Sequence, residues 1–145
     1  MGMCQVNVAV ANPRDVSRVF QEKFWVDTGA PYTFVPEDRL SEIGIQPVRA
    51  RDLILVDGRQ ERRLLGEAVL TVSDLEESLT CPVVFGPAGS LYLLGATALE
   101  IFGVRADPTT QQLKPIAAII GVFSVHEPAI SNREAIGADP PASPR

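Results

Sequence analysis

Cysteine, histidine and excess positive charge are all scarce in this 145-residue sequence. Two cysteines, Cys4 and Cys81, cannot form a disulfide framework or a four-ligand zinc site. The single histidine, His126, has no second histidine with which to complete a zinc-protease motif. Thirteen basic and eighteen acidic residues give a net charge of −5, which disfavours nucleic acid as a partner because phosphate binding needs a positive surface. We therefore expect no metal, no cofactor and no nucleic-acid partner.

Long apolar runs and a basic leader are missing as well. The longest apolar run, Ile116–Phe123, is far too short to cross a bilayer. The segment Met1–Val10 alternates polar and apolar residues, which is typical of a strand rather than of a signal sequence. We therefore expect a cytoplasmic location and no membrane partner, with both cysteines present as reduced thiols.

Proline and glycine, by contrast, are abundant, with twelve and eleven residues respectively. They divide the chain into short segments, as an all-β fold with many turns requires. An apolar content of 46% and a charged content of 21% are ordinary for a soluble protein, and the length fits one domain. We expect this domain to span 1–125 and a disordered tail to follow over 126–145, where Pro, Ala, Ser and charged residues accumulate.

Alternating apolar residues and turn signals predict the individual elements. Asp57-Gly58 between two β-like runs is a strong hairpin signal. Pro36 opens one short helix over Glu37–Ile43, and Gly103 closes another over Thr97–Phe102. The predicted strands are Cys4–Ala11, Val19–Val26, Tyr32–Val35, Leu53–Val56, Leu64–Val72, Leu79–Phe85 (an edge strand, because of Pro82), Leu91–Gly95, a hairpin within Val104–Ile116, and Ala117–Val125.

The segment Phe24–Ala30, with the sequence FWVDTGA, carries the residues suited to catalysis. Asp-Thr-Gly should occur by chance in only about 0.03 of chains of this length. Asp27 follows three bulky apolar residues, where a carboxylate is costly unless it is hydrogen-bonded. Gly29 permits a tight turn that points backbone groups at this carboxylate. The alternative is a simple surface turn at the end of a strand, since Asp and Gly both favour turns.

A second motif makes the sequence resemble the retropepsin-like aspartic proteases (clan AA), the family of retroviral proteases and their cellular and bacterial relatives. Members have a hydrophobic-hydrophobic-Asp-Thr-Gly-Ala loop and, some way further on, two hydrophobic residues and a glycine before a short helix. Asp27–Ala30 matches the first element, and Leu93–Gly95 before Ala98–Ile101 matches the second. In the family a flap hairpin lies between them, and its tip would fall at Val56–Gln60. The resemblance covers about Cys4–Pro115.

The resemblance implies a role for each matched residue. Asp27 would be the catalytic carboxylate, Thr28 would hydrogen-bond across a twofold axis, and Gly29 would offer its backbone to the substrate. The other predicted site residues are the loop residue Ala30, the flap residues Val56, Asp57, Gly58 and Arg59, and the loop-supporting residues Leu93, Leu94 and Gly95.

The sequence departs from the retroviral pattern at an ion pair. Retroviral members carry further Asp residues after the loop and an Arg after the second-motif glycine, where this chain has Pro31, Tyr32 and Ala96. Both sides of the ion pair are missing together, which favours a cellular or bacterial branch of the family.

One Asp-Thr-Gly motif supplies half of an aspartic-protease site. Two carboxylates must flank one water, as is known for aspartic proteases, one accepting its proton and the other, protonated, donating to the scissile carbonyl. The sequence has no second Asp-Thr-Gly or Asp-Ser-Gly, so the missing carboxylate would come from Asp27 of another copy. The apolar segments Met3–Val10 and Ile116–Val125 are candidates for interleaved dimer strands or for ordinary core packing. We predict an all-β, retropepsin-like closed barrel with one or two short helices that forms a twofold homodimer.

The predicted function is hydrolysis of peptide bonds in a peptide or protein substrate by an aspartic endopeptidase, with water as the nucleophile. The pH optimum would be acidic to near neutral, because the carboxylate pair must keep one proton. Alternatives are a non-catalytic retropepsin-fold module for binding or oligomerisation, an unrelated β-barrel with Asp27 in an exposed turn, and a Cys81–His126 nucleophile pair. Five arginines around the predicted flap either form a solvated hairpin or select acidic or polar substrates: Arg49, Arg51, Arg59, Arg62 and Arg63.

Overall fold

The computed structural model describes residues 4–117 and 121–122, which form mainly β-strands. The first two strands are β1 (Gln5–Asn12) and β2 (Asp15–Val26), and the other elements follow in short succession. They are β3 (Thr33–Pro36), α1 (Glu37–Glu42), β4 (Arg49–Ile54), β5 (Gln60–Val72), β6 (Glu77–Gly86), β7 (Leu93–Leu94), α2 (Ala96–Phe102), β8 (Val104–Asp107) and β9 (Gln112–Pro115).

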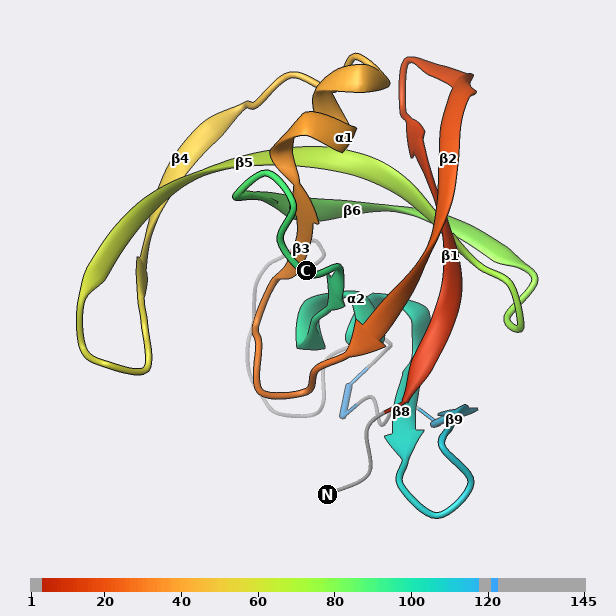
Figure 1. Ribbon diagram of the computed structural model, residues 1–145. Helices are drawn as coiled ribbons and strands as arrows, with labels where there is room; N and C mark the ends of the chain where they lie inside the picture. The colour runs from red at the N-terminus through yellow and green to blue at the C-terminus, as the bar shows by residue number, and fades with distance from the viewer. Residues whose placement is uncertain (1–3, 118–120, 123–145) are drawn as a thin grey trace, which may run out of the picture.

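Seven strands form one sheet in the order β1-β2-β7-β3-β6-β5-β4, and β8 and β9 form a separate hairpin (Figure 1). β1 also pairs with β5, with Val8 opposite Val72 and Ala11 opposite Val69. Pairing therefore runs in a closed circuit through six strands, from β1 through β2, β7, β3, β6 and β5 back to β1. β4 lies outside this circuit and pairs with the first part of the long strand β5.

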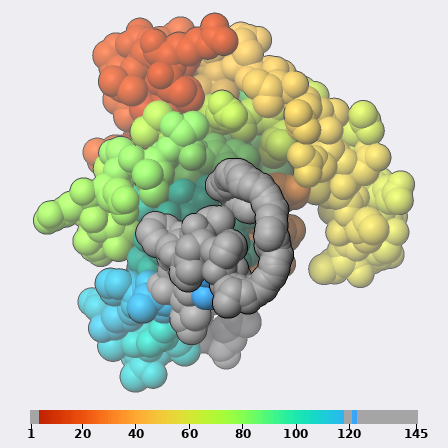
Figure 2. All heavy atoms as spheres, turned by 180° about the vertical axis from the view of Figure 1, so that it is seen from behind, coloured from red at the N-terminus to blue at the C-terminus, as the bar shows by residue number. Residues whose placement is uncertain are grey.

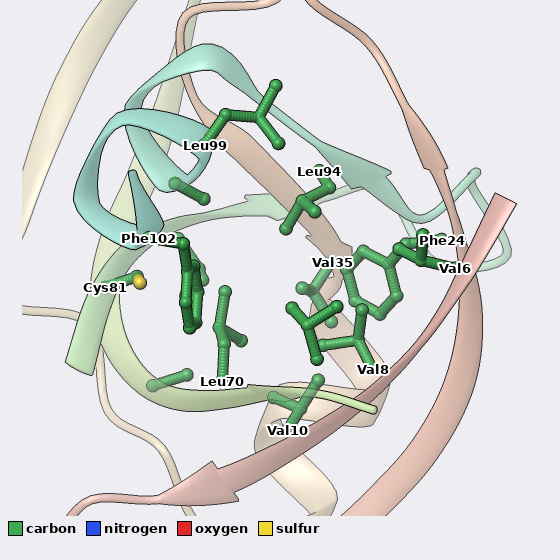
Figure 3. Close-up of a cluster of buried hydrophobic side chains, with 14 of the residues drawn as sticks. Val6, Val8, Val10, Phe24, Val35, Leu70, Cys81, Leu94, Leu99 and Phe102 are labelled. Atoms are coloured by element: carbon green, nitrogen blue, oxygen red, sulfur yellow. The ribbon is translucent and has the colours of Figure 1, made fainter. Parts of the chain in front are cut away.

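Apolar side chains from the strands and from α2 fill the inside of this circuit (Figure 3). Val8 and Val10 point inward from β1, as the alternating sequence predicts, and Leu70 and Leu94 are fully buried beside them. Phe102 brings α2 into the same cluster. Each such side chain contributes about 1.5–3 kcal/mol by its burial. The core therefore fixes β7 and α2, two elements whose backbones hydrogen-bond to the loop after β2.

A cationic side chain connects α1 to the surrounding strands. The Arg39 guanidinium lies 4.1 Å from the centroid of the Phe20 ring. It donates hydrogen bonds to the Tyr92 hydroxyl at 2.6 Å and to Glu22 at 3.2 Å. Because Tyr92 directly precedes β7, this cluster joins α1, β2 and the approach to β7.

The structure confirms both predicted helices. α1 starts after Pro36 and is followed by Gly44 at φ +80°. α2 starts one residue earlier than predicted, at Ala96, and ends at Gly103, whose φ of +68° is the left-handed conformation expected at a helix end.

The predicted strands within Cys4–Ile116 are present, but several of their ends differ. β2 begins at Asp15, earlier than predicted. Its first residues are exposed and mostly polar, so an apolar pattern could not reveal them. β4 also begins earlier than predicted, at Arg49, and its first residues are mostly polar as well. The run Leu91–Gly95 shrinks to the two residues of β7. Pro82 does not lie in an edge strand, since β6 runs between β3 and β5, although the β3 ladder begins only at Val83.

The predicted tail 126–145, with His126, and most of the predicted strand Ala117–Val125 lie outside the described residues. Of the two candidate dimer segments, Met3–Val10 falls mainly in β1, which places Val8 and Val10 in the core. Among residues 4–117 and 121–122, there is no helix with the length and apolar character that a membrane span needs.

Candidate active site

Backbone hydrogen bonds hold the loop that follows β2. The Asp27 amide donates to the Leu94 carbonyl at 2.9 Å, which ties the start of the loop to β7. The Gly29 amide donates to Asp27 Oδ1 at 3.0 Å, and the Ala30 amide donates to the Asp27 carbonyl at 3.2 Å. Asp27 is half-buried, whereas Thr28 and Gly29 are exposed. The carboxylate is thus oriented by its own loop and is still accessible to water.

The two motifs of the sequence meet at this loop. β7 pairs parallel with β2, with Trp25 opposite Leu93, and antiparallel with β3. Gly95 follows β7 at a position with no room for a side chain. A Cβ there would run into the Tyr32 carbonyl and lie 2.8 Å from the Ala30 carbonyl oxygen. Close packing of the two backbones therefore explains the glycine of the second motif.

Thr33 is a supporting residue that the sequence motifs did not identify. Its hydroxyl accepts a hydrogen bond from the Gly95 amide at 3.1 Å, and the residue is only 1% exposed. The amide of Ala96 donates to the Ala30 carbonyl at 2.8 Å, and that of Thr97 to the carbonyl of the next loop residue at 3.0 Å. Amides at the start of a helix have no partner within it, so the loop carbonyls satisfy them. α2 and Thr33 thus hold the loop from its buried side.

The segment predicted as a flap lies in the antiparallel hairpin of β4 and β5, which projects from the body of the molecule (Figure 1; yellow in Figure 2). At its tip the Leu55 amide donates to the Arg59 carbonyl at 2.8 Å, and Gly58 has a φ of +87° that favours glycine. Val56 is fully exposed. The Asp57 carboxylate accepts hydrogen bonds from the backbone amide and the Nε of Arg59, at 3.0 and 2.7 Å, and these bonds lower the pKa of Asp57.

A groove of about 790 Å³ lies between the Asp27 loop and this hairpin. Its volume is in the range of ligand-binding clefts, and most of its lining residues are apolar. The predicted site residues that line it are Asp27, Gly29, Ala30, Val56, Asp57 and Arg59, whereas Thr28, Gly58, Leu93, Leu94 and Gly95 do not. Arg63, one of the five arginines noted around the flap, also lines it, and the lining residues missed from the sequence are Pro31, Tyr32, Phe34, Leu53, Ile54, Leu55, Glu61 and Pro87. They come together only when the hairpin lies beside the loop.

The two cysteines are unsuited to nucleophilic catalysis. Cys4 and Cys81 are free and buried, which confirms the prediction of unpaired thiols. Burial raises the pKa of both, that of Cys81 to about 11. A thiol with so high a pKa is protonated near neutral pH and is a poor nucleophile.

Comparisons with known proteins bear on the fold. No protein-family model and no curated protein matches this chain. The solved structure of a foamy viral protease-reverse transcriptase in complex with an RNA/DNA hybrid matches with a TM-score of 0.51 and 14% identity. The match covers 81% of this chain and 13% of that chain, so this chain spans only a small part of the foamy viral protein. A retropepsin-like aspartic protease from Rickettsia conorii matches with a TM-score of 0.45 and 17% identity, over 73% of this chain and 88% of that one.

At 14% identity, the likeness to the foamy viral chain is a likeness of fold. It agrees with the mainly β architecture and the two short helices described above. This chain has a retropepsin-like fold.

Proposed function

We propose that this chain is an aspartic endopeptidase in which the Asp27 residues of two copies activate one water. The proposal rests on the surroundings of the Asp27 carboxylate. This carboxylate is held by the Gly29 amide at 3.0 Å and lines a groove that a projecting hairpin borders on its other side. The substrate would be an extended peptide that binds between the loop and the hairpin. The retropepsin-like fold supports the same function.

The second carboxylate has no candidate among the other acidic residues that line the groove. Asp57 is bound by Arg59 at the exposed tip of the hairpin, at 2.7 Å. Glu61 is bound by Arg63 at 3.1 Å. We therefore assign the second carboxylate to Asp27 of another copy, related by a twofold axis.

The proposed assembly is a twofold homodimer of closed barrels. The closed pairing circuit of six strands supports the barrel. The exposure of Thr28 suits its proposed hydrogen bond across the axis, and Ala30 would complete the loop around the catalytic pair. The flap residues Val56, Asp57, Gly58 and Arg59 would close over a bound peptide.

In this dimer the two Asp27 carboxyl groups share one proton, as in other aspartic proteases. Two carboxylates ~3 Å apart, at an effective dielectric constant of ~20, repel by roughly 5–6 kcal/mol, so one of them stays protonated. The charged carboxylate accepts a proton from water as the water attacks the peptide carbonyl, and the protonated one donates to the carbonyl oxygen. When the C–N bond breaks, a proton passes to the departing amine, and no covalent enzyme intermediate forms.

The test is cleavage of an unfolded protein substrate by the wild type and by two variants, Asp27→Asn and Asp74→Asn, across acidic to neutral pH. Asp74 is a matched control because it is an exposed aspartate in the turn between β5 and β6. The wild type and Asp74→Asn should cleave equally, whereas Asp27→Asn should lose about 10²–10⁴-fold in rate. Equal cleavage by all three would remove Asp27 from the mechanism. A wild type that associates and binds peptides without cutting them would instead identify a non-catalytic module.

A further inference from the structure

Three of the five arginines around the hairpin are neutralised by neighbouring carboxylates. The pairs are Arg59–Asp57 at 2.7 Å, Arg62–Asp52 at 2.8 Å and Arg63–Glu61 at 3.1 Å. Pairs near the surface contribute little to stability, but they cancel the local charge. Arg59 and Arg62 therefore fit the solvated hairpin that the sequence allows, whereas Arg63 is largely buried and also donates to the Phe85 carbonyl.

Arg51 differs because its partner is neutral. Its Nη1 donates a hydrogen bond to the Tyr32 hydroxyl at 2.7 Å, and its Cζ lies 5.6 Å from the centroid of the Tyr32 ring. No carboxylate of the described residues forms an ion pair with it. Its cross-strand neighbour is another cation, Arg63, and like charges opposite each other are unfavourable. Arg51 is therefore a half-buried cation whose charge is not compensated within the described residues.

Arg51 does not itself line the groove, but three of its neighbours do. Its partner Tyr32 lines the groove, and so do Leu53, two residues further along β4, and Arg63 across the ladder. Residues two apart on a strand share a face, so Arg51 lies on the same side as Leu53. The hydrogen bond to Tyr32 occupies one of the five N–H donors of the guanidinium.

We propose that Arg51 and Tyr32 form a subsite that binds the side-chain carboxylate of an acidic residue in the substrate. A guanidinium can donate two parallel hydrogen bonds to one carboxylate. The Tyr32 hydroxyl accepts from Arg51 and still has its own proton to donate to the same carboxylate. This inference rests on the proposed function, and it makes the substrate an extended peptide with Asp or Glu at one fixed position relative to the scissile bond.

The experiment compares pairs of C-terminally amidated peptides that differ only by Glu or Gln, with the substitution moved along the sequence. Amidation leaves the side chain as the varied carboxylate, and at about pH 6 the glutamate is ionised. The wild type should favour Glu at one position by about tenfold in kcat/KM, the equivalent of about 1.4 kcal/mol. The preference should shrink in roughly 1 M salt.

Three variants test which side chains cause the preference for Glu over Gln. Arg51→Gln should bring the Glu-to-Gln ratio close to one by losing rate on the Glu peptide, and Tyr32→Phe should lower the ratio part of the way. Arg49→Gln is the matched control, because it removes the same charge from the same strand. Arg49 is exposed, and within the described residues its side chain does not bond to Tyr32 or to any other residue that lines the groove. It should keep the wild-type ratio. Circular dichroism checks that each variant is folded.

Calorimetric binding of the same peptides to Asp27→Asn separates this inference from the proposed function. Asp27-dependent cleavage with equal use of Glu and Gln peptides at every position, or an Arg51→Gln enzyme that keeps the preference, would overturn the subsite alone. Tighter binding of Glu peptides that needs Arg51, without cleavage by the wild type, would support the subsite and overturn the protease. Equal binding and no cleavage would overturn both.

Discussion

Replacing Thr33 with valine removes one buried hydrogen-bond acceptor while it changes the side-chain shape little. The Thr33 hydroxyl accepts from the Gly95 amide at 3.1 Å, between residues 62 positions apart in the sequence. With valine, this amide would lose its partner in a place closed to water, where an unsatisfied donor costs about 1–3 kcal/mol. We therefore expect the free energy of unfolding to fall by that amount.

Urea denaturation followed by tryptophan fluorescence measures this loss. Trp25 is the only tryptophan and lies opposite Leu93 in the β2–β7 ladder, so it reports on the affected region. With an m-value of about 1–3 kcal/mol/M, the denaturation midpoint should move by about 1 M. All proteins are compared at one concentration, because association would itself shift the midpoint.

Two further variants test whether the loss of stability comes from the buried hydrogen bond. Thr71→Val is the matched control, since the Thr71 hydroxyl bonds to that of Ser78 at an exposed site, and it should cost less than about 0.5 kcal/mol. Thr33→Ser keeps the acceptor and should retain most of the wild-type stability. The reasoning is refuted if Thr33→Val unfolds at the wild-type midpoint, or if Thr33→Ser is destabilised as much as Thr33→Val.

Three other measurements test close packing, burial and hydrogen bonding in the structure. Gly95→Ala should lower the free energy of unfolding by at least about 1–3 kcal/mol in urea, because its Cβ would run into the Tyr32 carbonyl; an unchanged midpoint would contradict this contact. Cys81 should resist thiol-labelling reagents at about pH 8 until the protein unfolds, since burial raises its pKa to about 11, and labelling of the native thiol at the rate of a free cysteine would disprove this. Asp57 should titrate below 3.8 by NMR, because hydrogen bonds from Arg59 favour the charged carboxylate. Those bonds should stabilise the hairpin tip at neutral pH and be lost as the pH falls through the lowered pKa, and a titration midpoint at or above 3.8 would argue against them.

The loop and the hairpin were predictable from the sequence because their signals are local. Asp27–Ala30 follows a run of apolar residues, and Asp57-Gly58 separates two strand-like runs. The helix ends at Gly44 and Gly103 are equally local, since glycine accepts the positive φ found at both. Residues adjacent in the chain decide each of these features.

Contacts between distant residues could not be predicted in this way. The bond of Thr33 to Gly95, the pairing of β1 with β5 and the contact of Arg51 with Tyr32 depend on how the whole sheet folds. The start of β4 was missed because Arg49–Asp52 is a polar run that forms a strand through its pairing with β5. Most of the residues that line the groove were missed because they come from segments that meet only in the folded sheet.

Mixing wild-type and Asp27→Asn chains tests most directly whether two copies of Asp27 form one site. The two proteins are unfolded together in equal amounts, refolded at a fixed total concentration and assayed for cleavage. If each site needs both carboxylates, about one quarter of the dimers are intact and the activity should be about one quarter of that of the wild type alone. Activity of about one half, as expected for a site complete within a single chain, would contradict the account.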